Sequence, residues 1–363
     1  MTRQHQISKT DLATTRWIDG PVSALGDGEV RLSIDAFALT ANNVTYASFG
    51  GEPMHYWAFF PTGDPADEPG WGRVPVWGFA TVAESKAEGV AEGQRVYGYL
   101  PISDELVVNA AKVSGAGFMD GSAHRAGLSP IYNTYQFTGS DPAYDAGFEA
   151  AQMLFRPLYA TGWWLADTLT EASETSLATV IASSASSKTA LAMAHALKSR
   201  GTVQLVGLTS AANADYVRGT GLYAETLTYD QLSALNSAPA PAAYVDFRGD
   251  PALTAGVHAA TGEGLVRSLV VGATAWDVDR TPKPLVGPTP DFFFVPDVAA
   301  ARIAAVGPSL MATLNEDLRA FYPASARYCT PTEATGTSAV DAAWAAAVAG
   351  SVPADVGQIL RLG

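Results

Sequence analysis

Four short apolar runs separated by helix-like segments constrain the fold of this chain more than any other feature. The runs are LATVIAS (177–183), TVQLVGLT (202–209), AAYVDFRG (242–249) and VRSLVVGAT (266–274). Strands that alternate with helices are typical of βαβ units, in which successive strands lie parallel in one sheet. We therefore expect residues 151–290 to form an α/β domain with a doubly wound parallel sheet.

The sequence pattern before and after this region is different, because apolar residues alternate with polar ones in several segments. Val30, Leu32, Ile34 and Ala36 follow a period of two, which is typical of a half-buried strand. Further strands are expected at 74–85, at 93–101 and in VGQILRL near the C-terminus. Helices are expected at 150–169, with a break at Pro157, and around 297–319. We expect residues 1–150 and 291–363 to form a second, mainly-β domain.

Length and charge limit the class of protein. A chain of 363 residues is longer than one hydrophobic core usually serves, which agrees with two domains. The net charge of −14 disfavours nucleic acid and anionic membranes as partners, because both attract basic surfaces. No apolar run approaches the ~18 residues of a membrane span, and the N-terminal segment has no apolar export core. The expected compartment is the cytoplasm.

Cysteine and histidine are too sparse to predict a metal site. Cys329 is the only cysteine, so no internal disulfide can form, which agrees with a reducing compartment. The five histidines are scattered, and neither His-x-x-x-His nor Cys-x-x-Cys spacing is present.

The segment SSASSKTALAMAHALKSRG follows the first apolar run and stands where a phosphate-binding turn would be. A P-loop needs two glycines around its Lys-Ser/Thr pair; Lys188 and Thr189 are present, but both glycines are missing. A dinucleotide turn needs three small residues at three-residue spacing. Ser184, Ser187 and Ala190 meet that need, provided that none of them requires a positive φ. The segment therefore favours a dinucleotide.

The turn also offers hydrogen-bond donors to a phosphate. Ser184, Ser186 and Ser187 can donate to phosphate oxygens beside the N-terminus of the following helix, and Lys188 adds a positive charge there. The helix itself is expected from an apolar stripe that ends before Gly201. The alternative is that Ser187 only caps the helix and Lys188 is solvated.

The end of the second apolar run indicates which dinucleotide would bind. An NAD site usually places Asp or Glu there to hold the ribose hydroxyls, but this chain has Thr209 and Ser210. Hydroxyls can donate to the 2′-phosphate of NADP, whereas a carboxylate would repel it, so the expected cofactor is NADP(H). Asp246, at the carboxyl end of the third run, is a further candidate ligand; the alternative is a salt-bridged rim that includes Arg248.

With these segments placed, the chain resembles a medium-chain dehydrogenase/reductase of the zinc-free, quinone-oxidoreductase-like branch. The resemblance is carried by EVRLSIDAFALTANNVTYASFG, VPVWGFATVAESKAEGVAEGQRVYGY, PLYATGWWLAD and VGQILRL. It implies a GroES-like mainly-β catalytic domain, a Rossmann cofactor domain and a homodimer. The combination of MLFRPLYATGWW, SASSKTALAMA, GLTSAANADYV and PDFFFVPD is similar to a bacterial subgroup of unknown function.

The chain departs from the family pattern at three places. The glycine-rich cofactor turn is replaced by serines, and the zinc-binding cysteines are absent, which removes zinc-dependent alcohol oxidation. A basic residue often follows the family's second strand, but Asn213 and two alanines occupy that stretch here. The preference for NADP(H) therefore rests on Thr209, Ser210 and Lys188.

The resemblance places substrate-facing residues in the loop 40–46, TANNVTY. Tyr46 is the candidate proton donor or carbonyl partner, because a phenol serves both roles. Thr40 and Asn43 are expected to orient the substrate or the nicotinamide. The aromatic run 54–61 suits a flat, aromatic or apolar small molecule. The alternative is that Tyr46 and the aromatic run belong to the core.

Three functions are compatible with these residues. The leading one is zinc-independent, NADPH-dependent reduction of an activated C=C bond in a quinone, an enone or an enoyl thioester by hydride transfer. The second is a metal-free carbonyl reductase or alcohol dehydrogenase. The third is a protein that binds NADP(H) as a sensor without turnover.

Overall fold

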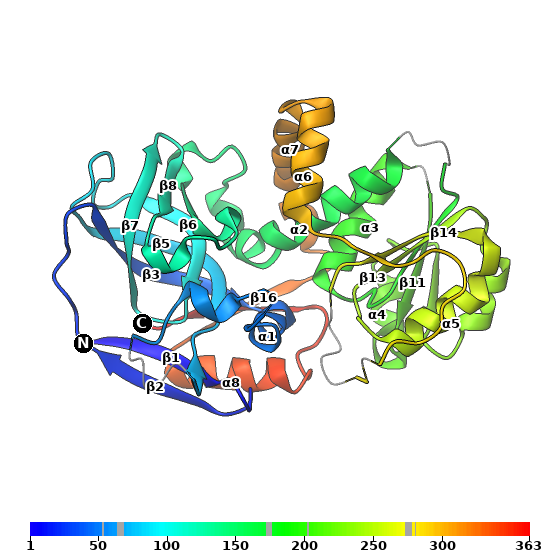
Figure 1. Cartoon of the computed structure of the whole chain (residues 1–363), viewed down its shortest axis with the longest axis horizontal. Helices are drawn as coiled ribbons and strands as arrows, with labels where there is room; N and C mark the ends of the chain where they lie inside the picture. The colour runs from blue at the N-terminus through cyan, green and yellow to red at the C-terminus, as the bar shows by residue number, and fades with distance from the viewer. Residues whose placement is uncertain (53, 64–68, 172–175, 202, 273–277, 280) are drawn as a thin grey trace. The chain divides into compact units, whose positions relative to one another are not determined.

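The computed structural model describes residues 1–52, 54–63, 69–171, 176–201, 203–272, 278–279 and 281–363. The chain divides into two compact units, Met1–Leu154 with Thr330–Gly363, and Phe155–Cys329 (Figure 1). The division expected from the sequence gave residues 291–329 to the mainly-β domain, whereas the structure gives them to the second unit. The reason is helix α7 (Ser309–Ser325), whose Phe321 ring packs on Phe155 and Tyr159 of α2 (Glu149–Thr170).

Unit 1 is built around an eight-stranded sheet that closes on itself. Its strand order is β16-β17-β3-β5-β6-β9-β8-β7, and an additional pairing of β3 with β7 completes a barrel. Closure removes the open edges of the six strands that take part. These are β3 (Glu29–Leu39), β5 (Pro75–Ser85), β6 (Arg95–Pro101), β7 (Glu105–Ser114), β8 (Gly117–Asp120) and β9 (Thr134–Phe137).

Smaller elements surround the barrel. Strands β1 (Thr2–Ser8), β2 (Thr15–Gly20) and β4 (Trp71–Gly72) form a separate three-stranded sheet. Strands β16 (Thr330–Thr335) and β17 (Val356–Arg361) extend the main sheet and are joined by α8 (Thr337–Val348). The strands expected at 30–36, 74–85, 93–101 and in VGQILRL are confirmed as β3, β5, β6 and β17, and the mainly-β architecture is confirmed with them.

The expected loop at 40–46 is wrong, because this segment forms helix α1 (Ala41–Ser48). Thr40 is the N-cap: its side chain accepts from the backbone N–H of Asn42, and the Asn43 side chain accepts from the backbone N–H of Thr40. Reciprocal bonds of this kind satisfy amide groups that a helix start leaves open. The capping residues therefore start a helix in a stretch of modest helix propensity.

Unit 2 is a parallel six-stranded sheet with helices around it. The strand order is β12-β11-β10-β13-β14-β15, which is the 3-2-1-4-5-6 order of a Rossmann fold when the strands are counted along the chain. The predicted Rossmann sheet is thus confirmed. The strands are β10 (Thr179–Ala182), β11 (Gln204–Thr209), β12 (Glu225–Thr228), β13 (Ala242–Asp246), β14 (Leu265–Val270) and β15 (Asp291–Phe292).

The helices of unit 2 include α3 (Lys188–Arg200), α4 (Ala214–Gly219), α5 (Pro251–Thr261) and α6 (Val295–Val306). Helix α4 packs on β11 and β12, α5 packs on β13, and α6 packs on α7. Figure 1 shows β11 and β13 between α3 and α5. Leu253 and Val257 of α5 share a buried cluster with Ile181, Val206 and Tyr244 of the strands, and this cluster forms the core on that side of the sheet.

Two helix predictions need correction. The break expected at Pro157 is absent, because α2 runs unbroken from residue 149 to residue 170. Close packing of Leu154, Phe155 and Tyr159, all buried, outweighs the hydrogen bond lost at the proline. The single helix expected around 297–319 is two helices, α6 and α7, separated at Gly307.

Two further comparisons concern the end of one strand and the search for membrane-spanning helices. The run expected to be a strand at 266–274 is β14, which ends at Val270, and residues 273–274 lie outside the described residues. In the part of the chain that the structure describes, no helix combines the length and the apolar character needed to cross a membrane.

Candidate functional site

The strand order of unit 2 reverses between β10 and β13, and ligands of doubly wound sheets bind at the carboxyl ends of such a pair. The chain leaves β10 through the serine turn 183–187 and enters α3. It leaves β13 through Phe247 and Arg248 toward α5. The serine turn identified from the sequence therefore lies at the edge where a dinucleotide would be expected.

The serine turn adopts a backbone conformation that favours glycine. Ser184 has a φ of 46°, in the left-handed region that L-residues other than Asn and Asp seldom occupy. The Ser187 N–H donates to the Ser184 carbonyl at 2.8 Å and closes the turn. The condition that none of the three small residues requires a positive φ is therefore wrong at Ser184. The turn has the shape of a glycine turn although it contains no glycine.

Helix α3 starts at the turn, as the sequence predicts. Ser187 is its N-cap and accepts from the Ala190 N–H at 3.3 Å; Lys188 and Thr189 are the first two helical residues and are half-buried. The helix ends at Gly201, which has a φ of 68°. The capping role of Ser187 is compatible with phosphate binding, because a cap uses only one of the amide groups at the helix start.

Close approach to the turn depends on glycines that lie outside it. A Cβ atom on Gly207 of β11 would lie 2.9 Å from the Ala185 Cβ atom. A Cβ atom on Gly162 of α2 would lie 2.5 Å from the backbone nitrogen of Met193 in α3. In the usual dinucleotide turn a glycine of the turn itself allows helix and strand to pack closely. Here the small residue is on the neighbouring element.

The segment after β11 is linked to the turn by a side-chain hydrogen bond. The Asn213 Nδ2 atom donates to the Ser186 Oγ atom at 3.1 Å. Ser210 is half-buried, whereas Thr209 is only 1% exposed and its Oγ1 atom has no partner among the described residues. Of the two hydroxyls predicted to bind a 2′-phosphate, the one on Ser210 is thus the more accessible. Asn213 was given no role from the sequence.

Asp246 is buried and its carboxylate is already used by the protein. The Oδ1 atom accepts from the Ser183 hydroxyl at 2.7 Å and from the backbone N–H groups of Arg248 and Gly249; the Oδ2 atom accepts from Thr254. Ser183 in turn accepts from the Phe247 and Arg248 N–H groups. The network joins the loops after β10 and β13.

These contacts describe Asp246 as a residue that holds two loops together. The Oδ1 atom accepts three of these hydrogen bonds and the Oδ2 atom one, and a direct contact between Asp246 and the cofactor stays a prediction from the sequence. Arg248 forms its ion pair with Asp250 at 3.2 Å, and its guanidinium lies over the Tyr229 ring. Sequence reasoning missed Ser183, because its partner is 63 residues away and no local pattern marks the pair.

In unit 1, the side chains of Thr40 and Asn43 form the N-terminal cap of α1. The Asn43 Oδ1 atom accepts from the Thr40 N–H at 2.7 Å, and its Nδ2 atom donates to the Pro75 carbonyl at 2.8 Å. Asn43 is 3% exposed. Both side chains thus fix the position of α1, and with it the position of Tyr46.

Tyr46 lies in a buried aromatic cluster. Its ring packs on Tyr56 and Tyr99, and the Trp77 Nε1–H donates to its phenol oxygen at 3.2 Å. Burial raises the pKa of the Tyr46 phenol, so the phenol stays neutral throughout the physiological pH range. The core alternative for the aromatic run holds for Tyr56, Phe59 and Phe60, which are all buried in this cluster.

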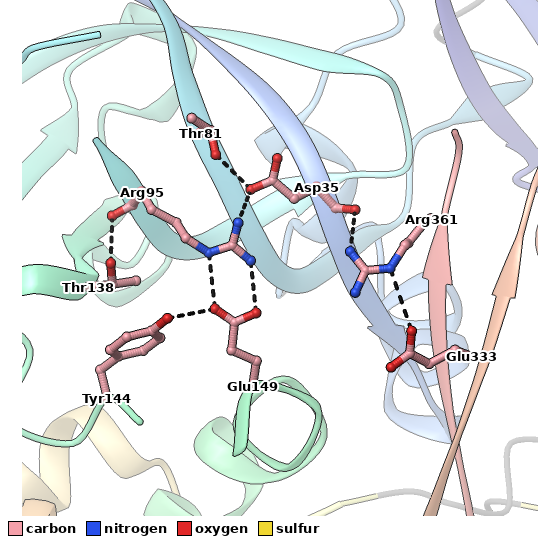
Figure 2. Close-up of polar contacts among 8 residues, drawn as sticks. All are labelled: Asp35, Thr81, Arg95, Thr138, Tyr144, Glu149, Glu333 and Arg361. Carbon is pink, nitrogen blue, oxygen red and sulfur yellow. Dashed lines mark hydrogen bonds and ion pairs between the residues drawn. The ribbon is translucent and has the colours of Figure 1, made fainter. Parts of the chain in front are cut away.

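A charged cluster in unit 1 was not predicted from the sequence. Figure 2 shows Arg95 between two carboxylates: its Nη1 atom lies 2.5 Å from Asp35, and its Nε and Nη2 atoms donate to Glu149 at 3.0 and 2.9 Å. Asp35 stands in a bulge of β3. Burial raises the pKa of its carboxyl, and Arg95 acts in the opposite direction. Because Glu149 is the first residue of α2, the cluster ties the start of that helix to the barrel.

The two units define an α/β protein with a GroES-like barrel and a Rossmann sheet, and solved structures share this fold over nearly the whole chain. CurA from Vibrio vulnificus in complex with NADPH has a TM-score of 0.63 and 11% identity, and the match covers 99% of both chains. The CurK enoyl reductase has a TM-score of 0.59 and 11% identity over 99% of this chain and 98% of its own. The Etr1p/NADP/crotonyl-CoA complex has a TM-score of 0.55 and 12% identity over 99% of both chains.

A family model gives a more specific assignment than the fold. The chain belongs to the family described as "Protein of unknown function (DUF2855)", whose model matches residues 37–353. No curated protein matches the sequence.

Proposed function

We propose that the chain is an NADP(H)-dependent oxidoreductase that reduces an activated C=C bond, in a quinone, an enone or an enoyl thioester, without zinc. The observation that carries the proposal is the serine turn: it has the left-handed residue, the helix start and the place at the strand-order reversal that a pyrophosphate requires. Structures of this fold include complexes with NADPH and with NADP and crotonyl-CoA, which supports the cofactor and the bond type.

The residues present fit such a cofactor. The N–H groups at the start of α3, with Ser184, Ser187, Lys188 and Thr189, would hold the pyrophosphate. Ser186, Ser210 and Asn213 offer neutral donors to a 2′-phosphate, and the two residues at the end of β11, Thr209 and Ser210, are themselves uncharged. When bound, a reduced nicotinamide would supply a hydride. In this proposal Thr209 and Asp246, which are both buried, stabilise the carboxyl edge of the sheet from inside the protein.

Tyr46 is the proposed carbonyl partner in unit 1. The Trp77 N–H can only donate, so the Tyr46 oxygen accepts that bond and the phenol proton is left to be donated. A neutral phenol in a dry aromatic setting can polarise a carbonyl oxygen by hydrogen bonding. Thr40 and Asn43 act through the cap of α1, which sets where Tyr46 lies. The aromatic surroundings suit a flat or apolar substrate.

The test is NADPH oxidation with a panel of quinones, enones, enoyl thioesters, and simple aldehydes and ketones. We expect turnover with at least one conjugated substrate and a loss of about a hundredfold in kcat/KM in Tyr46→Phe, because one positioned donor is removed. NADPH affinity should not change. Tyr135→Phe is the control, since Tyr135 is another buried phenol and its O–H donates to the Tyr99 carbonyl.

The outcomes separate the three functions. Turnover of simple aldehydes or ketones alone would replace the proposal by a metal-free carbonyl reductase. NADPH binding without oxidation of any substrate would identify a sensor. Full activity in Tyr46→Phe would show that the Tyr46 hydroxyl takes no part in the reaction. The homodimer and the cytoplasmic location stay predictions from the sequence.

A further inference from the structure

Arg73 is a buried arginine that has no carboxylate partner among the described residues. It lies between β4 and β5 in unit 1 and is 8% exposed. Its Nη1 atom approaches the Pro61 carbonyl at 3.5 Å, its Nη2 atom approaches the Ser103 hydroxyl at 3.3 Å, and its Nε atom has no partner. Both contacts are at the long end of the hydrogen-bond range. Burial lowers the pKa of its guanidinium to about 10.

The acidic residues that follow Ser103 in the sequence do not form ion pairs with Arg73. Asp104 accepts from Arg3 at 2.7 Å, and Glu105 accepts from Arg31 at 2.8 Å. The Ser103 hydroxyl donates its proton to the Glu105 carbonyl at 2.7 Å, so its oxygen is left to accept from Arg73. Among the described residues, Asp104 and Glu105 are thus each paired with another arginine.

Arg125 is a second buried arginine in unit 1, and its Nε and Nη2 atoms also form no hydrogen bond, but a carboxylate lies beside it. Its side chain is 1% exposed, and its Nε atom lies 2.9 Å from the Asp120 carboxylate. Its Nη1 atom also contacts the Tyr132 carbonyl and the Asn133 side chain at 3.2 Å. A buried charge is normally held by such partners, because an unpaired one is strongly destabilising. Arg73 lacks them.

We infer that Arg73 is the anchor of an oxyanion site in unit 1, which takes the carboxylate or phosphate group of a small molecule. The planar guanidinium offers parallel N–H groups that match two oxygens of either anion. The Nε–H and the loosely held Nη donors are the groups that the anion would engage. The site is independent of the proposed cofactor, because every residue that defines it belongs to unit 1 and none is assigned to the dinucleotide.

The test is thermal unfolding of the full chain titrated with inorganic phosphate or with acetate, against potassium chloride at equal ionic strength. We expect one of the two anions to raise the unfolding temperature saturably by about 3 °C or more. Phosphate and acetate are separate arms, so they tell a phosphate ligand from a carboxylate. Arg73→Gln should lose the response, and Arg125→Gln, if folded, should keep it.

The variants also predict opposite effects in buffer free of oxyanions. Arg73→Gln should unfold at the same or a higher temperature than the wild type, since it removes a desolvated charge, whereas Arg125→Gln should unfold at a lower one. The inference is overturned if neither anion exceeds chloride, or if Arg73→Gln responds as the wild type does.

A third variant tests whether the chain itself supplies the anion. Asp64, Asp67 and Glu68 lie outside the described residues. The variant combines Asp64→Asn, Asp67→Asn and Glu68→Gln, which removes all three charges. If one of these carboxylates were the counter-ion, the triple variant would gain an anion response that the wild type lacks, and this outcome would contradict the inference. An equal response in the wild type and the triple variant would support it.

Discussion

Ser184 adopts a backbone conformation that is usually found at glycine. A serine at a φ of 46° has a Cβ atom where glycine would have none, and this costs about 1–2 kcal/mol. The sequence revealed the small size of the residues in the turn but could not reveal this conformation. Backbone angles are set by the strand and helix on either side, which no local pattern encodes.

The conformation of Ser184 predicts that the glycine variant at this position is more stable than the alanine variant, which is the reverse of the order within a helix. Ser184→Gly should be more stable than Ser184→Ala by about 1 kcal/mol, because glycine adopts a positive φ without strain and both variants lose the same hydroxyl. Ser199, near the end of α3, is the control; there the alanine variant should be the more stable by about 1 kcal/mol. Urea unfolding of the four variants measures both differences. The same order at both positions would contradict a left-handed Ser184.

Tyr46 and its neighbours show a second limit of sequence reasoning at this scale. The residue type was enough to name a candidate phenol. Its burial and the bond from Trp77 depend on a contact across 31 residues and were not predictable from the sequence. The helix that carries it was missed because Asn43 closes the cap where Glu or Gln is the usual residue.

At the scale of elements, the repeated strand–helix pattern was sufficient to predict the Rossmann sheet. Continuous apolar runs marked β10, β11, β13 and β14. Strand β12 was missed because its sequence, ETLT, is polar at three of four positions and it lies at one edge of the sheet. The link from Ser183 to Asp246 was also missed, since it exists only once β10 and β13 are neighbours.

The cluster of Figure 2 predicts that the start of α2 is held by charge. A double-mutant cycle of Arg95→Gln and Glu149→Gln should give a coupling energy of about 1 kcal/mol, because both side chains are less than one-third exposed and the contact is bidentate. The coupling should weaken in high salt. The exposed pair Arg218 and Asp215 is the control and should give a coupling near zero. Equal couplings in the two pairs would show that burial of the cluster has no effect.

At the scale of the whole chain, the two units separate the proposed tasks. Unit 2 supplies the edge of a parallel sheet for a nucleotide, and unit 1 supplies a neutral phenol in an aromatic cluster and a buried guanidinium. The sequence was enough to predict both architectures. It could not assign residues 291–329, because the packing of Phe321 on α2, which places them in unit 2, is a long-range contact.

Calorimetric titration with NADPH, NADH and ATP tests the central claim, that a dinucleotide binds at the serine turn. The wild type should bind NADPH more tightly than NADH and should not bind ATP in a magnesium-dependent way. Ser186→Trp should weaken NADPH binding at least tenfold, because an indole would fill the space over the turn, while Ser199→Trp at the other end of α3 should bind as the wild type does. Unchanged NADPH affinity in a folded Ser186→Trp variant, or magnesium-dependent ATP binding in place of NADPH binding, would contradict the account.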